Sequence, residues 1–436
     1  MTSEVALLNR SAVALAADSA ATVQHWEKDH FEKYYFKGTN KIFQLSTAHP
    51  VGIMIYATAS LQGTPWDLLI KCYRDQLGVK SHDYVEGYAL DLFDYITKNS
   101  NIFSNDIQEK QFLADVDIVA SRILSGLFGD NSFQSALDDV AKQAVATNYL
   151  SSIETKITSS RFVANTNQND LDSALAKYEN SVKEFFGNSQ FYSFWAASVD
   201  LQKLARLSIE GQFKADFTAL NNSGIVVAGF GDKEYFPRLN AYRCYGLILG
   251  KLIFEEETAK RQTISQTDVS AFVSFAQDDM IQTFSWGASL TVLMELDRQT
   301  SKSLDIYYDE LVTAGLARDL SNDTPSLSQR EKIKRDTLKR FRDGVIEYSL
   351  SSHSQPMRRV LGALPFDELA ELAHTLVLLE SLKERVTSAS SSVSGPIDVA
   401  VISKNDGFIW IKRKHYFDPK LNPRYFLRRG LIGLAS

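Results

Sequence analysis

Two nearly continuous apolar segments near the start of the chain constrain its fold most strongly. Residues 5–8 and 13–17 are separated by the polar turn 9–11, and this spacing predicts a β-hairpin. Strands with one solvated face alternate apolar and polar residues, whereas these two segments are apolar throughout. The sequence therefore predicts a sheet that is covered on both faces.

The second residue offers an unusual chemistry. Thr2 directly follows Met1, and methionine aminopeptidases accept a small second residue, so we expect Thr2 to become the N-terminus of a mature chain. An N-terminal threonine combines a nucleophilic hydroxyl with a general base, its own α-amine. A neighbouring cation lowers the pKa of that amine by like-charge repulsion. Lys41 is the candidate cation, and Asp18 is the candidate carboxylate that keeps Lys41 in place and charged.

A second strand pair and a helix are predicted after the hairpin. Residues 41–46 and 51–57 are short apolar runs typical of strands. Thr64 suits the N-cap of the following helix, and Pro65 suits its first helical position. Apolar residues recur at helical spacing through residues 66–77.

The segment 13–22, Val-Ala-Leu-Ala-Ala-Asp-Ser-Ala-Ala-Thr, resembles a segment of the β-type subunits of the 20S proteasome, in the N-terminal-nucleophile (Ntn) hydrolase superfamily. Counting back from Asp18 by the family's spacing reaches Thr2 without a gap, and Lys41 matches the family's lysine. The longer spacing between Asp18 and Lys41 implies a loop insertion at residues 25–37. The resemblance implies an α+β fold, a four-layer αββα Ntn-hydrolase sandwich with a large helical insertion.

The resemblance also implies roles for individual residues. Thr2 takes the place of the family's nucleophile. The backbone N–H of Ala57 takes the place of an oxyanion-hole glycine; alanine supplies the N–H, but we do not expect it to adopt a positive φ. The family's loop serine is assigned to Ser394, with Ser392 as the alternative register.

Two features of the family's site have no direct match. A serine that hydrogen-bonds the terminal amine is missing, and either Gln277 or Asp278 replaces it or both simply begin a helix. An aspartate is also missing from the loop 387–395, which makes Asp398 and Glu384 candidates for displaced partners.

Later segments complete the predicted core. An apolar strand over residues 225–232 ends in a glycine turn, and its partner spans 235–248. A helix is predicted over 366–386, followed by a strand at 396–403 and its hairpin partner at 408–411.

Two helical insertions separate the parts of this core. Helical spacing over residues 107–127, 133–150 and 171–186 predicts the first insertion, and interleaved charges over 300–350 predict a solvated helical hairpin as the second. The predicted division assigns 1–78 to the first core part, 79–212 to the helical insertion, 213–299 to the second core part, 300–364 to the charged insertion, 365–415 to the C-terminal core part and 416–436 to a tail.

Composition excludes several classes of protein. A net charge of −6 argues against a general nucleic-acid binder. Only Cys72 and Cys244 occur, which favours the reducing cytoplasm over a disulfide framework. Glu4 and Arg10 interrupt the first apolar residues, so no signal peptide is expected. No apolar run approaches the ~20 residues that span a bilayer, so we expect no membrane contact.

No cofactor or metal is expected. The fragment 229–231 has the first two glycines of a dinucleotide loop, but Glu234 occupies the third glycine position. The residues 25–30 include two histidines and two acids, yet no metal-binding motif supports them.

The combined features predict a cytoplasmic threonine hydrolase that cleaves amide bonds, with a peptide or protein as substrate, after removal of Met1. Proteasome relatives build rings, so a homo-oligomer is plausible by resemblance. The alternative is a scaffold or partner-binding protein that keeps the fold without turnover.

Overall fold

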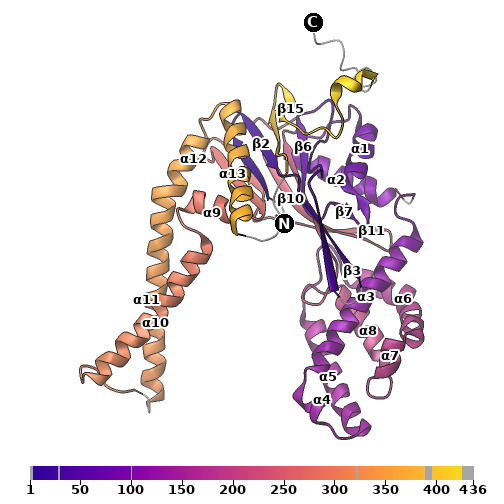
Figure 1. The fold of residues 1–436 in the computed structure, drawn as a ribbon. Coiled ribbons are helices and arrows are strands. Elements are labelled where there is room, and N and C mark those ends of the chain that lie inside the picture. The colour runs from indigo at the N-terminus through magenta and orange to yellow at the C-terminus, as the bar shows by residue number, and fades with distance from the viewer. Residues whose placement is uncertain (1–2, 28–29, 100, 321–322, 388–394, 425–436) are drawn as a thin grey trace.

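Two antiparallel sheets lie at the centre of the molecule, with helices on their outer sides (Figure 1). The computed structural model describes residues 3–27, 30–99, 101–320, 323–387 and 395–424. The expectation of a mixed α+β fold with antiparallel sheets is confirmed.

The first sheet contains the N-terminal hairpin at its centre. Its strands run in the order β13 (Ser270–Ala276), β1 (Ser3–Asn9), β2 (Ala12–Ala17), β14 (Asp398–Ser403) and β15 (Gly407–Lys412). Every residue of β1 and β2 is buried, as the unbroken apolar pattern predicts.

The second sheet carries the strands predicted after the hairpin. Its order is β11 (Lys251–Glu256), β10 (Arg238–Ile248), β9 (Ser223–Gly229), β6 (Val51–Ala57) and β5 (Ile42–Gln44), with β12 (Gln262–Thr263) beside β10. Two small hairpins lie outside the sheets: β3 (Ala21–Glu27) with β4 (His30–Phe36), and β7 (Ser60–Leu61) with β8 (Thr64–Pro65). The first of these occupies the place where a loop insertion is expected.

The alternation of side chains along the strands assigns them to separate layers. Leu15 and Met54 belong to the apolar cluster between the two sheets. On the outer side of the first sheet, Val5 and Leu7 pack against α13 (Phe366–Thr387). On the outer side of the second sheet, the covering helices are α1 (Trp66–Leu77) and α2 (Val85–Lys98). The order of layers is therefore helix, sheet, sheet, helix.

Two local predictions need correction. Helix α1 begins at Trp66, with Pro65 at its N-cap, because Thr64 and Pro65 pair with the strand β7 instead. Helix α2 falls within the predicted insertion 79–212, yet its apolar face packs on the second sheet.

The rest of that segment is a helical bundle with its own core. It consists of α3 (Asn105–Phe128), α4 (Asn131–Ser135), α5 (Asp139–Ser159), α6 (Gln168–Asn188), α7 (Gln190–Trp195) and α8 (Leu201–Gln212). The continuous helix predicted over 133–150 is wrong, because Asp138 caps α5 with its carboxylate on the N–H of Ala141.

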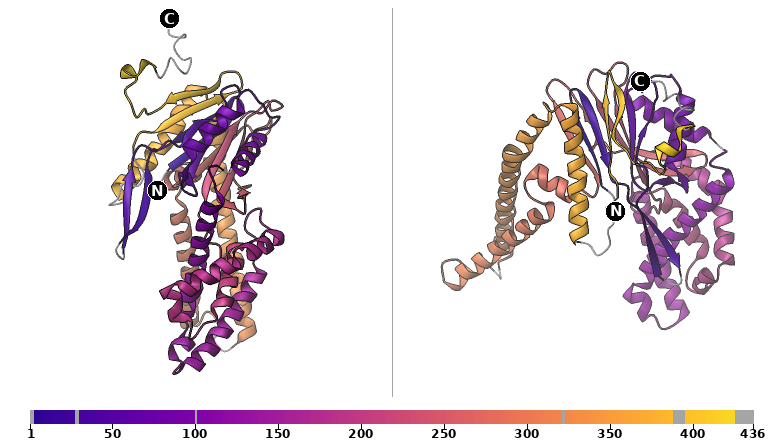
Figure 2. Two further views of the ribbon diagram at one scale, coloured as in Figure 1. Left: turned by 90° about the vertical axis from the view of Figure 1, so that its right-hand side faces the viewer. Right: turned by 45° about the horizontal axis from the view of Figure 1, so that its top comes forward.

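A long helical hairpin extends from the other side of the sheets, and it stands apart from the bundle in Figure 1 and in the right view of Figure 2. We call α10 (Leu290–Thr313) and α11 (Thr324–Ser349) the arm. Short helices connect the arm to the core: α9 (Asp279–Trp286) before it, then the π-turn Leu350–Ser354 and α12 (Gln355–Leu361) after it. The C-terminal segment contains a short 3-10 turn, Pro419–Leu421.

Candidate functional site

The predicted lysine and aspartate come from opposite sheets and meet between them. Asp18 directly follows β2 of the first sheet, and its N–H donates to the carbonyl oxygen of Ser3, 3.1 Å away. Lys41 directly precedes β5 of the second sheet, and its carbonyl oxygen accepts from the N–H of Ile55. The stacking of the two sheets therefore brings this pair together.

The contacts of Lys41 are short and shielded from water. Its Nζ lies 2.5 Å from Oδ1 of Asp18 and 3.0 Å from Oε1 of Glu4. The Lys41 side chain is 5% exposed, and both carboxylates are fully buried. Asp18 also accepts from the backbone N–H of Ser3 at 3.1 Å and of Ala20 at 3.3 Å, so its carboxylate has a fixed orientation.

Glu4 is a site residue that the sequence prediction missed. Along β1 the even-numbered Ala6 and Leu8 face the other sheet, so strand alternation directs Glu4 to the same side. The signal was present, since a carboxylate within an otherwise apolar, fully buried strand requires a cation. The resulting cluster brings the carboxylates of Glu4 and Asp18 to the ammonium of Lys41.

Ala57 ends β6 at the same end of the sheet as Lys41. It has a φ of 63°, so the expectation that an alanine would avoid a positive φ here is wrong. A second alanine with a positive φ, Ala276 at 60°, lies opposite Ser3 in the first sheet. Left-handed backbone at a residue with a Cβ costs roughly 1–2 kcal/mol. Such strain concentrates at functional sites.

Thr2, Ser394 and its alternative Ser392 lie outside the described residues. The structure therefore assigns them no position, and their predicted roles stay predictions.

The substitute residues proposed from the sequence have structural partners of their own. Asp398 lies opposite Ala17 but bonds to both the backbone N–H and the Nζ of Lys414. Glu384 accepts from Nε2 of Gln277 at 3.5 Å. The first contacts join β14 to Lys414, and the second joins α13 to the residue that follows β13.

Asp278 also has a local role. Its Oδ2 accepts from Oγ of Ser274 at 2.7 Å, and it occupies the N-cap position of α9. Asp278 therefore stands at the start of a helix, although its side chain caps no N–H there, and its proposed role at the terminal amine stays a prediction.

A small polar cavity of about 170 Å³ adjoins the turn that follows Ala57. Thr58 and Ser60 line it from the turn, and Asp115 lines it from α3 of the bundle. Asp115 is 3% exposed, with Nε2 of Gln111 bonded to its Oδ1 at 2.9 Å. Burial raises the pKa of the Asp115 carboxyl to about 6. No sequence pattern connects this bundle residue with Ala57.

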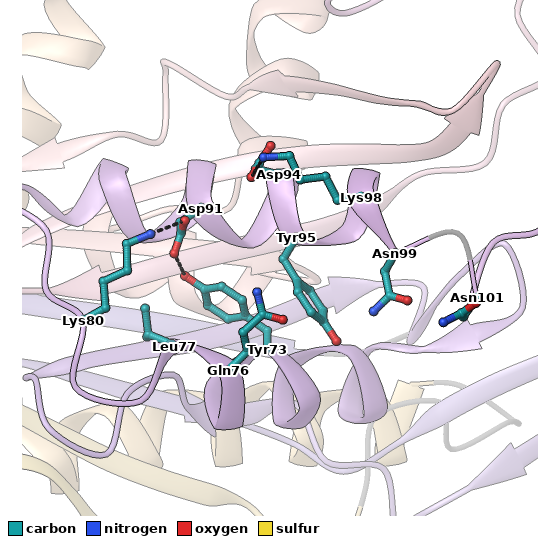
Figure 3. Close-up of a pocket in the computed structure, with 10 residues that line it drawn as sticks. All are labelled: Tyr73, Gln76, Leu77, Lys80, Asp91, Asp94, Tyr95, Lys98, Asn99 and Asn101. Carbon is teal, nitrogen blue, oxygen red and sulfur yellow. Dashed lines mark hydrogen bonds and ion pairs between the residues drawn. The ribbon is translucent and has the colours of Figure 1, made fainter.

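A second polar pocket, of about 350 Å³, lies between α1 and α2 (Figure 3). In this pocket the carboxylate of Asp91 accepts hydrogen bonds from the hydroxyl of Tyr73 at 2.9 Å and from Nζ of Lys80 at 2.7 Å. The pKa of Asp91 is lowered, because these hydrogen bonds outweigh its partial burial. None of the residues that line this pocket belongs to the Lys41 cluster.

Two kinds of site are not found in the part of the chain that the structure describes: a metal-ligand cluster and a helix that crosses a membrane. Within it, no three His, Cys, Asp or Glu side chains are grouped so that they could hold a metal ion. Among the same residues, no helix combines the length and apolar character needed to cross a bilayer.

Comparisons with known proteins add little to this geometry. No family of known sequences matches the chain, and no curated protein matches it. A matching solved structure is that of the Anbu (Gly-1) mutant from Hyphomicrobium sp. strain MC1, at 11% identity over 100% of this chain and 99% of that one. The TM-score of this match is 0.25, and a score this low carries no argument about fold or activity.

Proposed function

We propose that the protein is an N-terminal threonine hydrolase with the αββα architecture of the Ntn superfamily, acting on amide bonds of peptides or proteins. The observation that supports the proposal is the buried contact between Lys41 and Asp18 beside the backbone of Ser3. Thr2 precedes Ser3 in the chain, so removal of Met1 creates the reactive terminus. Ser394 is proposed as an auxiliary residue.

The proposed reaction needs no cofactor. The Oγ of Thr2 attacks the scissile carbonyl while its proton passes to the α-amine, and the N–H of Ala57 donates to the developing oxyanion. The protonated amine then gives its proton to the leaving amine, which breaks the C–N bond and leaves an ester on Oγ. Water hydrolyses this ester by the same proton route and restores the free hydroxyl.

Lys41 and Asp18 have distinct proposed roles. The ammonium of Lys41 lowers the pKa of the Thr2 amine, so that more of the amine is free to accept a proton. Asp18 acts through Lys41 and through the backbone N–H of Ser3. It is therefore a positioning residue.

Covalent labelling tests the proposal. Intact mass spectrometry should show loss of Met1, and a threonine-directed epoxyketone should then add one equivalent to the protein. Thr2→Ala should abolish the labelling, and Lys41→Ala should slow it at least about 100-fold, a typical effect for loss of a group that tunes a base. The matched control is Lys37→Ala, because Lys37 is an exposed lysine of the same segment. A processed protein that takes no label contradicts the proposal.

The second candidate is a binding scaffold without turnover, and Glu4 is the observation that favours it. Its carboxylate adds a second negative charge beside Lys41, which opposes the lowering of the amine pKa. A chain that retains Met1 and takes no label fits this candidate. The intact mass spectrum of the epoxyketone-treated protein distinguishes the two candidate functions.

A further inference from the structure

The small cavity beside Ala57 contains a buried carboxylate without a cation. Asp115 is 3% exposed, and its Oδ1 accepts a hydrogen bond from Nε2 of Gln111, a neutral group. Among the residues that the structure describes, no lysine, arginine or histidine pairs with Asp115. The buried carboxylates of Glu4 and Asp398, by contrast, each contact a lysine. Because a buried charge is costly unless it is paired, Asp115 is suited to bind a cation from outside the described chain.

The second oxygen of this carboxylate faces the cavity. Oδ2 of Asp115 makes no hydrogen bond within the described residues, yet the surrounding protein does not enclose it. Burial raises the pKa of the carboxyl to about 6, so the group is mostly ionised above pH 7. None of the described residues that line the cavity carries a positive charge. The cavity therefore presents one uncompensated negative charge.

The hydroxyl groups that line the cavity can accept hydrogen bonds but not donate them into it. Oγ1 of Thr58 donates to the carbonyl oxygen of Asn222 at 3.0 Å, and Oγ of Ser223 donates to that of Cys244 at 3.3 Å. The hydroxyl of Tyr245 likewise donates to Glu255, 2.6 Å away. A hydroxyl has only one hydrogen, so these three oxygens are left as acceptors. A ligand must then supply donors, and guanidinium and ammonium groups have donors and no acceptors.

The size and position of the cavity suit a side chain. Its volume of about 170 Å³ is below the ~300–1,000 Å³ of pockets that enclose a whole drug-sized ligand. Thr58 follows Ala57 in the chain, and Ser223 lies opposite Ala57 in the second sheet. Neighbouring strands are only about 4.8 Å apart. A substrate carbonyl held at the N–H of Ala57 would therefore have the cavity beside it.

We propose that this cavity binds the cationic end of a basic substrate side chain, a guanidinium or an ammonium group, with Asp115 as its counter-ion. Asp115 comes from α3, so the helical bundle supplies the residue that selects the substrate. Binding of the cation stands on the cavity alone, whereas its part in substrate selection rests on the proposed hydrolysis.

Binding of two small probes to the full chain tests the cation site. The probes are butylguanidinium and its uncharged analogue butylurea, and calorimetric titration at pH 7.5 measures both affinities. The wild type should bind butylguanidinium at least about tenfold more tightly, as expected for hydrogen bonds to a charged group. Asp115→Asn should remove this difference and leave the affinity for butylurea unchanged. The matched control is Asp106→Asn, because Asp106 is an exposed acid of the same helix. Equal affinities of the wild type for the two probes, or equal effects of the two variants, overturn the proposal.

A second variant leaves Asp115 in place. Ser60 lines the cavity, so Ser60→Lys brings a resident ammonium close to the carboxylate, and it should lower the affinity for butylguanidinium at least about tenfold. Ala59→Lys is the matched control, because Ala59 is exposed and does not line the cavity. An unchanged affinity of Ser60→Lys, or an equal loss in Ala59→Lys, contradicts the assigned site.

Covalent labelling tests the part in substrate selection. Two peptide epoxyketones are compared, one with arginine next to the reactive group and one with citrulline, its uncharged analogue. The wild type should react at least about tenfold faster with the arginine reagent, and Asp115→Asn should lose this preference by slowing that reagent alone. Equal rates in the wild type overturn the role in selection but leave the hydrolase intact. A protein that binds butylguanidinium but takes neither label supports the cation site and contradicts the hydrolysis.

Discussion

Ser3 and Asp18 hold each other through two hydrogen bonds of equal length. The N–H of Asp18 donates to the carbonyl oxygen of Ser3, and the N–H of Ser3 donates to Oδ1 of Asp18, each at 3.1 Å. The second bond uses the same carboxylate oxygen that contacts Lys41. A single buried carboxylate thus connects the start of β1, the end of β2 and the lysine of the other sheet.

Replacing Lys41 should destabilise the fold strongly. Lys41→Met leaves Glu4 and Asp18 buried together without their cation, and removing one partner of a buried pair costs about 3–5 kcal/mol. Urea denaturation at pH 7 measures this loss of stability. Lys37→Met is the control, and an unchanged stability of Lys41→Met at pH 7 contradicts the prediction.

Glu4→Gln should shift the pH dependence of epoxyketone labelling. The variant removes one negative charge beside Lys41, so the pKa of the Thr2 amine should fall and labelling should begin at a lower pH. Labelling rates between pH 5 and 9 measure the shift. A profile identical to that of the wild type would show that Glu4 does not act on the nucleophile.

Ala57→Gly should stabilise the protein slightly. Glycine relieves left-handed strain of roughly 1–2 kcal/mol but loses roughly 0.5–1 kcal/mol of chain entropy. The expected net gain is about 0.5–1 kcal/mol in the free energy of unfolding. Ala59→Gly is the matched control, because Ala59 has no positive φ and should lose stability. A loss at both positions would show that Ala57 is not strained.

Asp115 should make stability fall as pH rises through about 6. Its carboxyl has a pKa raised by burial to about 6, so the folded state binds this proton more tightly than the unfolded state does. The contribution of this proton to the free energy of unfolding is fully present below pH ~4 and is lost as pH rises through the pKa of the folded state. For a pKa shift of this size the contribution is about 2–3 kcal/mol.

Asp115→Asn removes this titration. The free energies of unfolding of the wild type and of Asp115→Asn, measured at pH 4, 6 and 8, should therefore follow different pH dependences. Compared with the wild type, the variant should be more stable at pH 8 than at pH 4. Parallel curves for the two proteins would contradict the assignment.

Gly229→Ala should be among the most damaging substitutions in the sheets. Gly229 has a φ of 142°, and an added Cβ would lie 2.0 Å from the carbonyl oxygen of Pro50. Overpacking of a core costs about 1–3 kcal/mol, and backbone strain adds to it. Gly38→Ala, which meets no atom within 4 Å, is the matched control. The melting temperature of Gly229→Ala should be several degrees lower than that of Gly38→Ala.

The sequence predicted those parts of the fold that local pattern specifies. Unbroken apolar strands placed β1 and β2 correctly, and Lys41 and Asp18 do meet. Glu4 was missed although a carboxylate in a buried apolar strand requires a cation, because only the stacking of the two sheets shows which cation it meets. The positive φ of Ala57 was not expected, because the intrinsic preference of alanine opposes it, yet the folded chain adopts it.

Longer-range features were harder to predict. The prediction assigned residues 79–212 as one insertion, so it did not foresee that α2 packs on the second sheet. Asp115 and Ala57 lie far apart in the chain, and only the folded chain brings their surroundings together at one cavity.

Lys41 and Asp18 come from different sheets. The proposed chemistry can therefore begin only when both sheets have formed and stacked. A growing or half-folded chain that has built only one sheet lacks either the cation or its counter-ion. Its terminal amine is then an ordinary one and its hydroxyl is inert. Under the proposed chemistry, the protein becomes reactive only after the two layers close on each other, so a newly made chain is protected from its own nucleophile.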